Sequence, residues 1–359
     1  MNNKLSVAAL FLLAAVGVGR TEAANFSSVY AFGDSLSDSG KSSSSVWSIY
    51  NFLNGYPGPV NPNGNCDASH PCPPYFEGRY SNGPATVERV ANALLPGGAN
   101  AGNFFNYSVA GATSGIGNFG DGGSQSAPGG FALPGMAQQI GFYLNSATPT
   151  ANALYFVWGG ANDYLTDVYI PLAQQPSLDA SAVARSAAQT AATNIAGYVG
   201  ALAGFGAETI LVPNLPDLGL TPFVVGQGQD VIDPAREYSL TFNQTLASLL
   251  GLVDNKFAAT DIVEFDSFGL FNAIVANPAG FGFGDAVSAC VALPGACADP
   301  DNHVFWDDFH PTAAMHALVA DAMVSQVPLP AAVWLFAAGL LTLLGRRPFA
   351  ASATAIRAA

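Results

Sequence analysis

Segments rich in apolar and β-branched residues alternate along the chain with longer segments whose apolar residues recur at helical spacing. The first kind predicts buried β-strands at 29–32, 105–109, 153–158, 209–212 and 262–265. The second kind predicts helices near 84–95, 180–203, 233–254 and 312–325. This alternation is typical of βαβ units around a parallel sheet, so the pattern predicts an α/β domain with at least five strands.

The last two predicted helices begin at proline-containing sequences. Asp233-Pro234 precedes one helix, and His310-Pro311-Thr312 precedes the other. Proline loses no hydrogen bond in the first turn of a helix, so both sequences favour a helix start at that point.

Three predicted strands are followed by small and polar residues. The sequence Gly33-Asp34-Ser35-Leu36-Ser37-Asp38-Ser39-Gly40 follows the first strand, and it places Ser35 where a strand is expected to turn into a helix. Segments 110–114 and 159–163 follow two other strands. Ligands of open parallel sheets gather at the carboxyl ends of the strands, so we expect Ser35, Gly111 and Asn162 to lie close together.

The sequence Trp306-Asp307-Asp308-Phe309-His310-Pro311-Thr312 supplies a base and an acid for such a site. A serine hydroxyl needs a base at neutral pH, and histidine is the side chain whose ordinary pKa suits that task. A carboxylate beside the histidine fixes its tautomer and stabilises the imidazolium. The spacing of three residues favours Asp307 over Asp308 as this carboxylate. Ser35, Asp307 and His310 are therefore the candidate nucleophile, orienting acid and base.

Acyl transfer builds negative charge on the carbonyl oxygen, which needs hydrogen-bond donors. The backbone amides of Ser35 and Gly111 and the side-chain amide of Asn162 could supply three. Asp34 and Asp163 are interpreted as structural carboxylates that bind loop amides. Arg79 is interpreted as an organiser of its loop rather than as part of the site.

The N-terminal segment and the charge indicate an exported acidic protein. Residues 1–23 contain Lys4, then an apolar stretch and small residues, which together predict a secretory signal peptide. Residues 24–326 are expected to form one large α/β domain with a substantial core. The formal net charge of the chain is −14, which argues against nucleic-acid binding and against electrostatic attraction to an anionic membrane.

The C-terminal segment 327–347 has the length and flanks of a membrane span. It runs uncharged from Val327 to Gly345 and then meets Arg346-Arg347, which keeps the C-terminus on the cytoplasmic side. The segment resembles the Pro-Glu-Pro type of C-terminal sorting signal (PEP-CTERM), in its Val-Pro-Leu-Pro-Ala variant. The resemblance implies an exosortase-like sorting protease as partner, transient membrane anchoring before cleavage, and delivery to the cell surface, the outer envelope or the medium. Residues 348–359 form a short tail.

The cysteines fall into two local pairs, Cys66 with Cys72 and Cys290 with Cys297. Export to an oxidising compartment predicts a disulfide within each pair, each fixing one loop. Neither pair has a histidine-rich zinc spacing beside it, so we expect no metal.

Four of these sequence blocks, 33–36, Gly111, 160–163 and 307–310, stand in the order found in GDSL hydrolases of the SGNH superfamily. The chain resembles this family over nearly all of residues 24–326. Segments 78–84, 213–222 and 242–243 resemble most closely its secreted phospholipase, lecithinase and haemolysin branch. The resemblance implies a flavodoxin-like, three-layer α/β/α sandwich around a central, mainly parallel five-stranded sheet, and no cofactor.

The function expected from these observations is a secreted serine esterase or lipase that hydrolyses carboxylic esters of lipids or of acylated small molecules through an acyl-enzyme. A carbohydrate acetyl esterase acting on exopolysaccharide, an acyltransferase and a non-catalytic surface or matrix protein are the alternatives. Loops 118–133 and 281–283 are rich in aromatic residues and glycine. They are candidates for an apolar acyl pocket or for ordinary packing.

Overall fold

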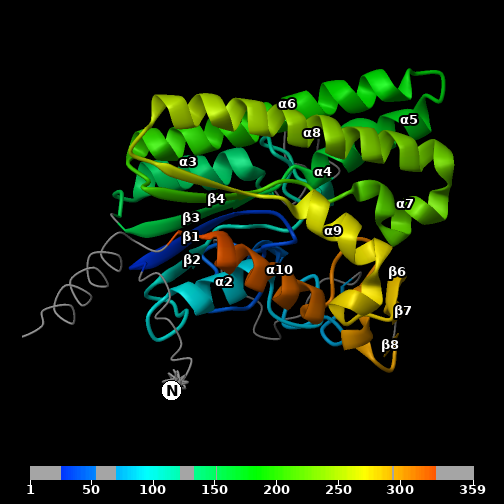
Figure 1. Cartoon of the computed structure of the whole chain (residues 1–359), viewed down its shortest axis with the longest axis horizontal. Helices are drawn as coiled ribbons and strands as arrows, with labels where there is room; N and C mark the ends of the chain where they lie inside the picture. Colours follow the sequence, from blue (N-terminus) through cyan, green and yellow to red (C-terminus); the bar gives the residue numbers. More distant parts are fainter. Residues whose placement is uncertain (1–25, 54–69, 122–132, 151, 293–294, 329–359) are drawn as a thin grey trace, which may run out of the picture.

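The fold is built around one parallel sheet in a computed structural model of the chain (Figure 1), which describes residues 26–53, 70–121, 133–150, 152–292 and 295–328. The sheet has five strands in the order β2-β1-β3-β4-β5, and each neighbouring pair is parallel. The predicted five-stranded parallel sheet is therefore confirmed. The strands are β1 (Ser28–Gly33), β2 (Phe104–Asn106), β3 (Ala153–Trp158), β4 (Thr209–Pro213) and β5 (Asp261–Phe265).

Helices cover both faces of this sheet, and the whole forms three layers (Figure 1). One face carries α3 (Met136–Ser146), α6 (Ala180–Phe205) and α8 (Gln229–Lys256), which we call the α6 layer. The other face carries α2 (Thr86–Leu94) and α10 (Ala313–Gln326), which we call the α10 layer. The remaining helices are α1 (Ile49–Leu53), α4 (Ala161–Tyr164), α5 (Ile170–Gln174), α7 (Pro222–Gln227) and α9 (Ser267–Ala276), with a π-helix at Leu165–Tyr169 between α4 and α5.

Side chains of each strand alternate between the two helical layers. On β3, Tyr155 and Val157 join the core under the α6 layer, whereas Leu154 and Phe156 join the core under the α10 layer. Successive side chains of a strand point to opposite faces, so a strand covered on both faces is apolar at every position. All six residues of β3 are buried. This explains why the continuous apolar run at 153–158 predicts both ends of the strand.

Short strands outside the main sheet surround the chain segment that leads to Asp307. They are β6 (Asp285–Ala289), β7 (Val291–Ala292), β8 (Gly295–Ala296) and β9 (His303–Phe305). Strands β7 and β8 form an antiparallel pair, and a disulfide joins Cys290 to Cys297 across it. Cys72 is also disulfide-bonded, and its predicted partner Cys66 lies outside the described residues.

The predicted start of α8 is wrong. Helix α8 begins at Gln229, immediately after Gly228, and Pro234 lies inside the helix rather than in its first turn. Gly228 has a φ of 95°, which glycine adopts readily and which ends α7. Proline inside a helix removes one backbone hydrogen bond, but Pro234 is buried against the core, and this packing offsets the loss.

Helix α3 is absent from the predicted set, although its sequence carries a signal. Its buried residues Met136, Ile140 and Tyr143 have the i, i+4, i+7 spacing of one helix face. This helix matters for the site, because one of its side chains reaches the end of β1.

Candidate active site

Ser35 lies two residues beyond β1, in a turn that we call the serine turn (residues 33–40). The turn starts at Gly33, whose backbone is bound by the buried Gln139 of α3. The Gly33 amide donates to Gln139 Oε1 at 2.9 Å, and Gln139 Nε2 donates back to the Gly33 carbonyl at 2.8 Å. A Cβ at position 33 would lie 2.3 Å from the carbonyl oxygen of Trp158 on β3. The end of β1 thus lies between Gln139 of α3 and Trp158 of β3, and this fixes the point at which the serine turn begins.

No helix follows Ser35 within the described residues up to α1, so the expected strand-to-helix junction is wrong. The Asp34 carbonyl accepts the amides of Ser37 and Asp38, which closes a single turn. The Asp38 carboxylate then accepts the amides of Gly40 at 2.8 Å, Ile49 at 2.7 Å and Ala110 at 2.8 Å. These bonds draw the chain back towards the core instead of along a helix axis.

His310 lies on a second turn, residues 306–312, which we call the histidine turn. Its Nε2 is 2.8 Å from Ser35 Oγ, and its Nδ1 is 2.8 Å from both carboxylate oxygens of Asp307. Asp307 Oδ1 also accepts the amides of Phe309 at 2.9 Å and His310 at 2.8 Å. Asp308 is exposed, so of the two candidate acids it is Asp307 that contacts the imidazole. The three predicted catalytic side chains therefore form one hydrogen-bonded chain.

Carboxyl groups of the two turns differ in their pKa. Burial raises the pKa of Asp34 to about 6 and that of Asp38 to about 7, although backbone amides bound to each carboxylate oppose the rise. Burial also raises the pKa of Asp307, but nearby His310 and the hydrogen bonds from His310 and Phe309 outweigh it, and the pKa lies below its ordinary value. Asp307 is thus held as the anion that a histidine base requires.

The predicted oxyanion donors lie beside the serine turn. Gly111 has a φ of 79°, and a Cβ there would lie 2.4 Å from Asn118 Oδ1, so this position requires glycine. Asn118 Nδ2 donates to the carbonyl of Ala110 at 3.0 Å and holds the loop around Gly111. Asn162, buried at the start of α4, donates from Nδ2 to the Ala112 carbonyl at 3.1 Å. One amide hydrogen of Asn162 is thereby fixed, which sets the direction of the other.

A buried polar network joins Asp163 to the loop that carries Gly111. Asp163 accepts the Ser114 amide at 2.8 Å and the Ser114 hydroxyl at 2.6 Å. Asn194 donates to the Ser114 hydroxyl at 3.0 Å, and Tyr198 donates to the Ser114 carbonyl at 2.5 Å. Burial raises the pKa of Asp163 to about 7. Asp34 and Asp163 both bind loop amides, as the sequence predicts for structural carboxylates.

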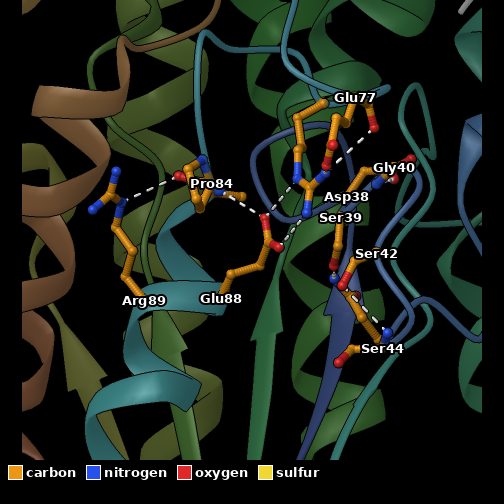
Figure 2. A network of polar contacts seen from close by, with 12 residues as sticks. Asp38, Ser39, Gly40, Ser42, Ser44, Glu77, Pro84, Glu88 and Arg89 are labelled. Atoms are coloured by element: carbon orange, nitrogen blue, oxygen red, sulfur yellow. Dashed lines mark hydrogen bonds and ion pairs between the residues drawn. The ribbon is translucent and has the colours of Figure 1, made fainter. Parts of the chain in front are cut away.

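Arg79 organises its own loop, as the sequence suggests. Its guanidinium is buried and donates to Glu88 at 2.7 and 3.0 Å and to Glu77 at 3.2 Å. Figure 2 shows Glu77 and Glu88 on two sides of the polar network to which they belong. Glu88 also accepts the Ala85 amide at 2.9 Å, which ties the loop to the start of α2. The donors of Arg79 are thus directed at protein carboxylates.

A cavity of about 520 Å³ opens over the catalytic side chains. Ser35, Gly111, Asn162 and His310 all line it, together with apolar side chains that belong to both helical layers. Loop 118–133 contributes Phe119, Gly120 and Leu133 to this lining, as expected for one of the two candidate acyl loops. Loop 281–283 follows the packing alternative, because Phe283 is buried in the core under the α10 layer and the loop does not line the cavity. Apolar lining residues include Leu36, Ile49, Leu53, Leu165, Phe271 and Met315.

Three aromatic residues around the histidine turn are not anticipated by the catalytic blocks. The rings of His70 and Tyr80 lie 4.2 Å apart, and the Tyr80 ring lies 5.0 Å from that of His310. Tyr75 donates its hydroxyl to Asp307 Oδ2 at 2.9 Å. Tyr80 falls in segment 78–84, where the family resemblance was visible. Tyr75 and His70 carry no such signal.

No group of three His, Cys, Asp or Glu side chains in the described ranges is placed to hold a metal ion. No helix among the same residues is long and apolar enough to cross a membrane. The predicted signal peptide at 1–23 and nearly all of the predicted sorting segment at 327–347, with the tail 348–359, lie outside the described residues.

The chain is similar in sequence to a protein family and to known proteins of plants and bacteria. The family model "GDSL-like Lipase/Acylhydrolase" matches residues 29–323. A GDSL esterase/lipase of Arabidopsis thaliana is 27% identical over 197 residues, covering 50% of this chain and 54% of the relative, so the chain spans about half the length of such plant relatives. A phosphatidylcholine-sterol acyltransferase of Aeromonas hydrophila is 27% identical over 351 residues, covering 82% of this chain and 88% of the relative. A crystal structure of a lipolytic G-D-S-L family member from Veillonella parvula covers 83% of this chain and 94% of its own, at 13% identity and a TM-score of 0.36.

Proposed function

The chain belongs to the GDSL-like lipase/acylhydrolase family, and we propose that it is a serine esterase or lipase that cleaves carboxylic esters through an acyl-enzyme on Ser35. The observation that carries the proposal is the continuous contact from Asp307 through His310 to Ser35 Oγ, with 2.8 Å on each side of the imidazole. This is the arrangement in which a serine hydroxyl becomes a nucleophile.

In the proposed reaction, His310 Nε2 takes the proton of Ser35 as Oγ attacks the ester carbonyl. The oxyanion is stabilised by the backbone amides of Ser35 and Gly111 and by the side-chain amide of Asn162, and a donor of this kind is worth about 3 kcal/mol. His310 then protonates the leaving alcohol. Water, activated by the same imidazole, releases the carboxylic acid and regenerates Ser35.

The cavity favours ester substrates whose acyl group is apolar. Its lining is dominated by aliphatic and aromatic side chains, and a sugar would leave its hydroxyls there without partners. This favours a lipid or another apolar ester over an acetylated polysaccharide. The connected catalytic side chains also argue against a non-catalytic surface role.

The test is hydrolysis of p-nitrophenyl acetate, butyrate, octanoate and palmitate, with acetylated xylan in parallel. We expect kcat/KM to rise from acetate to the longer esters and Ser35→Ala to abolish turnover. Ser325→Ala makes the same chemical change on an exposed part of α10 and should retain full activity. Turnover that persists in Ser35→Ala would refute the assignment, and exclusive cleavage of the acetylated polysaccharide would refute the substrate class.

Acyl transfer is a second candidate function, favoured by the extent of the similarity to the phosphatidylcholine-sterol acyltransferase, which covers 82% of this chain. An acyl-enzyme can pass its acyl group to an alcohol instead of water if the alcohol binds in the apolar cavity. Incubation of a phospholipid with a sterol or a long-chain alcohol would produce a new ester in that case. Release of free fatty acid alone would leave hydrolysis as the function.

We also infer export and surface sorting from residues 1–23 and 327–347. Detection of the chain in the envelope or the medium, shortened at both ends, would support this inference. A full-length chain in the cytoplasm would contradict it.

A further inference from the structure

Tyr75 contacts the catalytic acid from a part of the chain 232 residues away. Its hydroxyl donates to Asp307 Oδ2 at 2.9 Å, and the residues are 5% and 8% exposed, respectively. The donors on Oδ1 come from the histidine turn itself, namely the amides of Phe309 and His310 and the imidazole. Tyr75 therefore brings to the carboxylate a donor that its own turn does not supply.

The ring of Tyr75 is held by packing that does not involve Asp307. It meets the Trp306 ring edge-on, at 5.9 Å between centroids, and it is buried with Cys290. Cys72 and Cys297 pack against the same cluster, so both disulfide-bonded segments border this tyrosine. Such support restricts the ring and directs its hydroxyl.

The loop that carries Tyr75 is fastened to the histidine turn at a second point. Phe76 donates its amide to the Ser81 carbonyl at 2.8 Å, which closes the loop on itself. The Ser81 hydroxyl donates to the Pro311 carbonyl at 2.9 Å, one residue beyond His310. The loop and the turn therefore move together, and the Tyr75 hydroxyl keeps its place relative to Asp307.

We propose that Tyr75 is a positioning residue: its hydroxyl holds the Asp307 carboxylate in the orientation from which Asp307 fixes His310 against Ser35. The proposal rests on the esterase function proposed above. A hydrogen bond to a buried anion is stronger than one between neutral groups, and it restricts rotation of the carboxylate about its last torsion. Tyr75 does not line the cavity, so it acts on the reaction through Asp307 and not on the substrate.

The variant Tyr75→Phe removes the hydroxyl and keeps the ring in its packing. We expect kcat to fall about tenfold, which corresponds to the loss of one charge-assisted hydrogen bond, with KM unchanged. Tyr30→Phe is the matched control. Tyr30 lies on β1, away from the site, and its hydroxyl is 3.0 Å from Thr150 Oγ1. That control should keep the kcat of the unmodified protein.

The pH profile separates positioning from a purely structural role. Loss of an O–H donor makes the Asp307 carboxylate more basic, so the Asp307–His310 pair holds its proton more tightly. The acidic limb of kcat/KM, along which the base His310 becomes protonated, therefore moves to higher pH in Tyr75→Phe. Other titratable groups near the pair are Asp34, His70, Tyr80 and His316, and they are intact in the variant. A variant whose stability alone had changed would keep the unmodified profile.

A double-mutant cycle completes the test. If Tyr75 acts through Asp307, Tyr75→Phe has no further effect on kcat in an Asp307→Ala background. An equal loss in both backgrounds, or a Tyr75→Phe protein with unchanged kcat and pH profile, would overturn the proposal. Ser35→Ala distinguishes the two levels: activity surviving in that variant removes the esterase function itself, whereas an inactive Ser35→Ala beside an unaffected Tyr75→Phe removes only the role of Tyr75.

Discussion

The serine turn and the histidine turn each hold a catalytic side chain in place, but different kinds of contact stabilise them. The serine turn is held mainly from outside, by the side chain of Gln139 on Gly33 and by the reach of Asp38 to Ile49 and Ala110. The histidine turn is held mainly from within, by its own amides on Asp307. The carboxyl groups of the two turns also differ. Burial raises the pKa of Asp38, whereas His310 and the hydrogen bonds of its own turn lower the pKa of Asp307. A local motif can therefore specify most of the histidine turn, to which Tyr75 adds one distant donor on Asp307, whereas the serine turn depends mainly on distant residues.

The largest expected effect tests the internal order of the histidine turn. His310→Ala should lower kcat by about a millionfold, since neither a base for Ser35 nor an acid for the leaving group remains. Asp307→Ala should cost less, about ten thousandfold, because it removes the orienting acid and leaves the base. Single-turnover measurement of acyl release with a p-nitrophenyl ester gives both values. Equal losses in the two variants would mean that His310 cannot act at all without Asp307.

Loss of the clamp on β1 should produce the largest effect on stability. Gln139→Ala leaves the buried amide and carbonyl of Gly33 without their partners and opens a cavity, so the free energy of unfolding should fall by about 3 kcal/mol. Asn145→Ala removes an exposed amide from the same helix and should change the free energy of unfolding by less than about 0.5 kcal/mol. Urea denaturation measures both. If the two variants were equally stable, the serine turn would not depend on α3.

The disulfide between Cys290 and Cys297, beside the histidine turn, should contribute somewhat less to the free energy of unfolding than Gln139 does. Cys290 and Cys297 enclose a short loop, and the amides of Cys290 and Val291 donate to the carbonyls of Phe305 and Trp306, next to Asp307. The double substitution Cys290→Ala with Cys297→Ala should lower the free energy of unfolding by about 2 kcal/mol, through the added freedom of the unfolded chain. Thermal melting compared with the parent protein checks the value. If kcat falls by more than the loss of folded protein explains, the β7–β8 pair also supports the position of Tyr75.

The same division explains what the sequence could predict. The strands and the catalytic blocks are local features: the run at 153–158 matches β3 at both ends, and Asp307 and His310 are three residues apart. The roles of Gln139 and Tyr75 are not predictable from the sequence, because their partners lie 106 and 232 residues away and neither residue type is unusual at its position. The sequence left both interpretations of the aromatic loop 281–283 open for a related reason, since composition alone does not distinguish a pocket wall from a core.

The smallest expected effect is a pH dependence of stability that has opposite signs at the two turns. The pKa values of Asp34, Asp38 and Asp163 are raised to between about 6 and about 7, so from the ordinary carboxyl range to pH 7 the folded protein binds more protons than the unfolded chain. Stability contributed by these groups therefore falls as pH rises through this window. Asp307, with its lowered pKa, contributes stability that is lost only as pH falls below the ordinary carboxyl range.

We expect the free energy of unfolding to be higher at pH 5 than at pH 8 by more than about 1 kcal/mol, the scale of one pKa unit. Asp163→Asn should reduce this difference when urea denaturation is repeated at both pH values. A protein equally stable at pH 5 and pH 8 would show that Asp34, Asp38 and Asp163 stay ionised, and that the contrast between the serine turn and the histidine turn lies in hydrogen bonding alone.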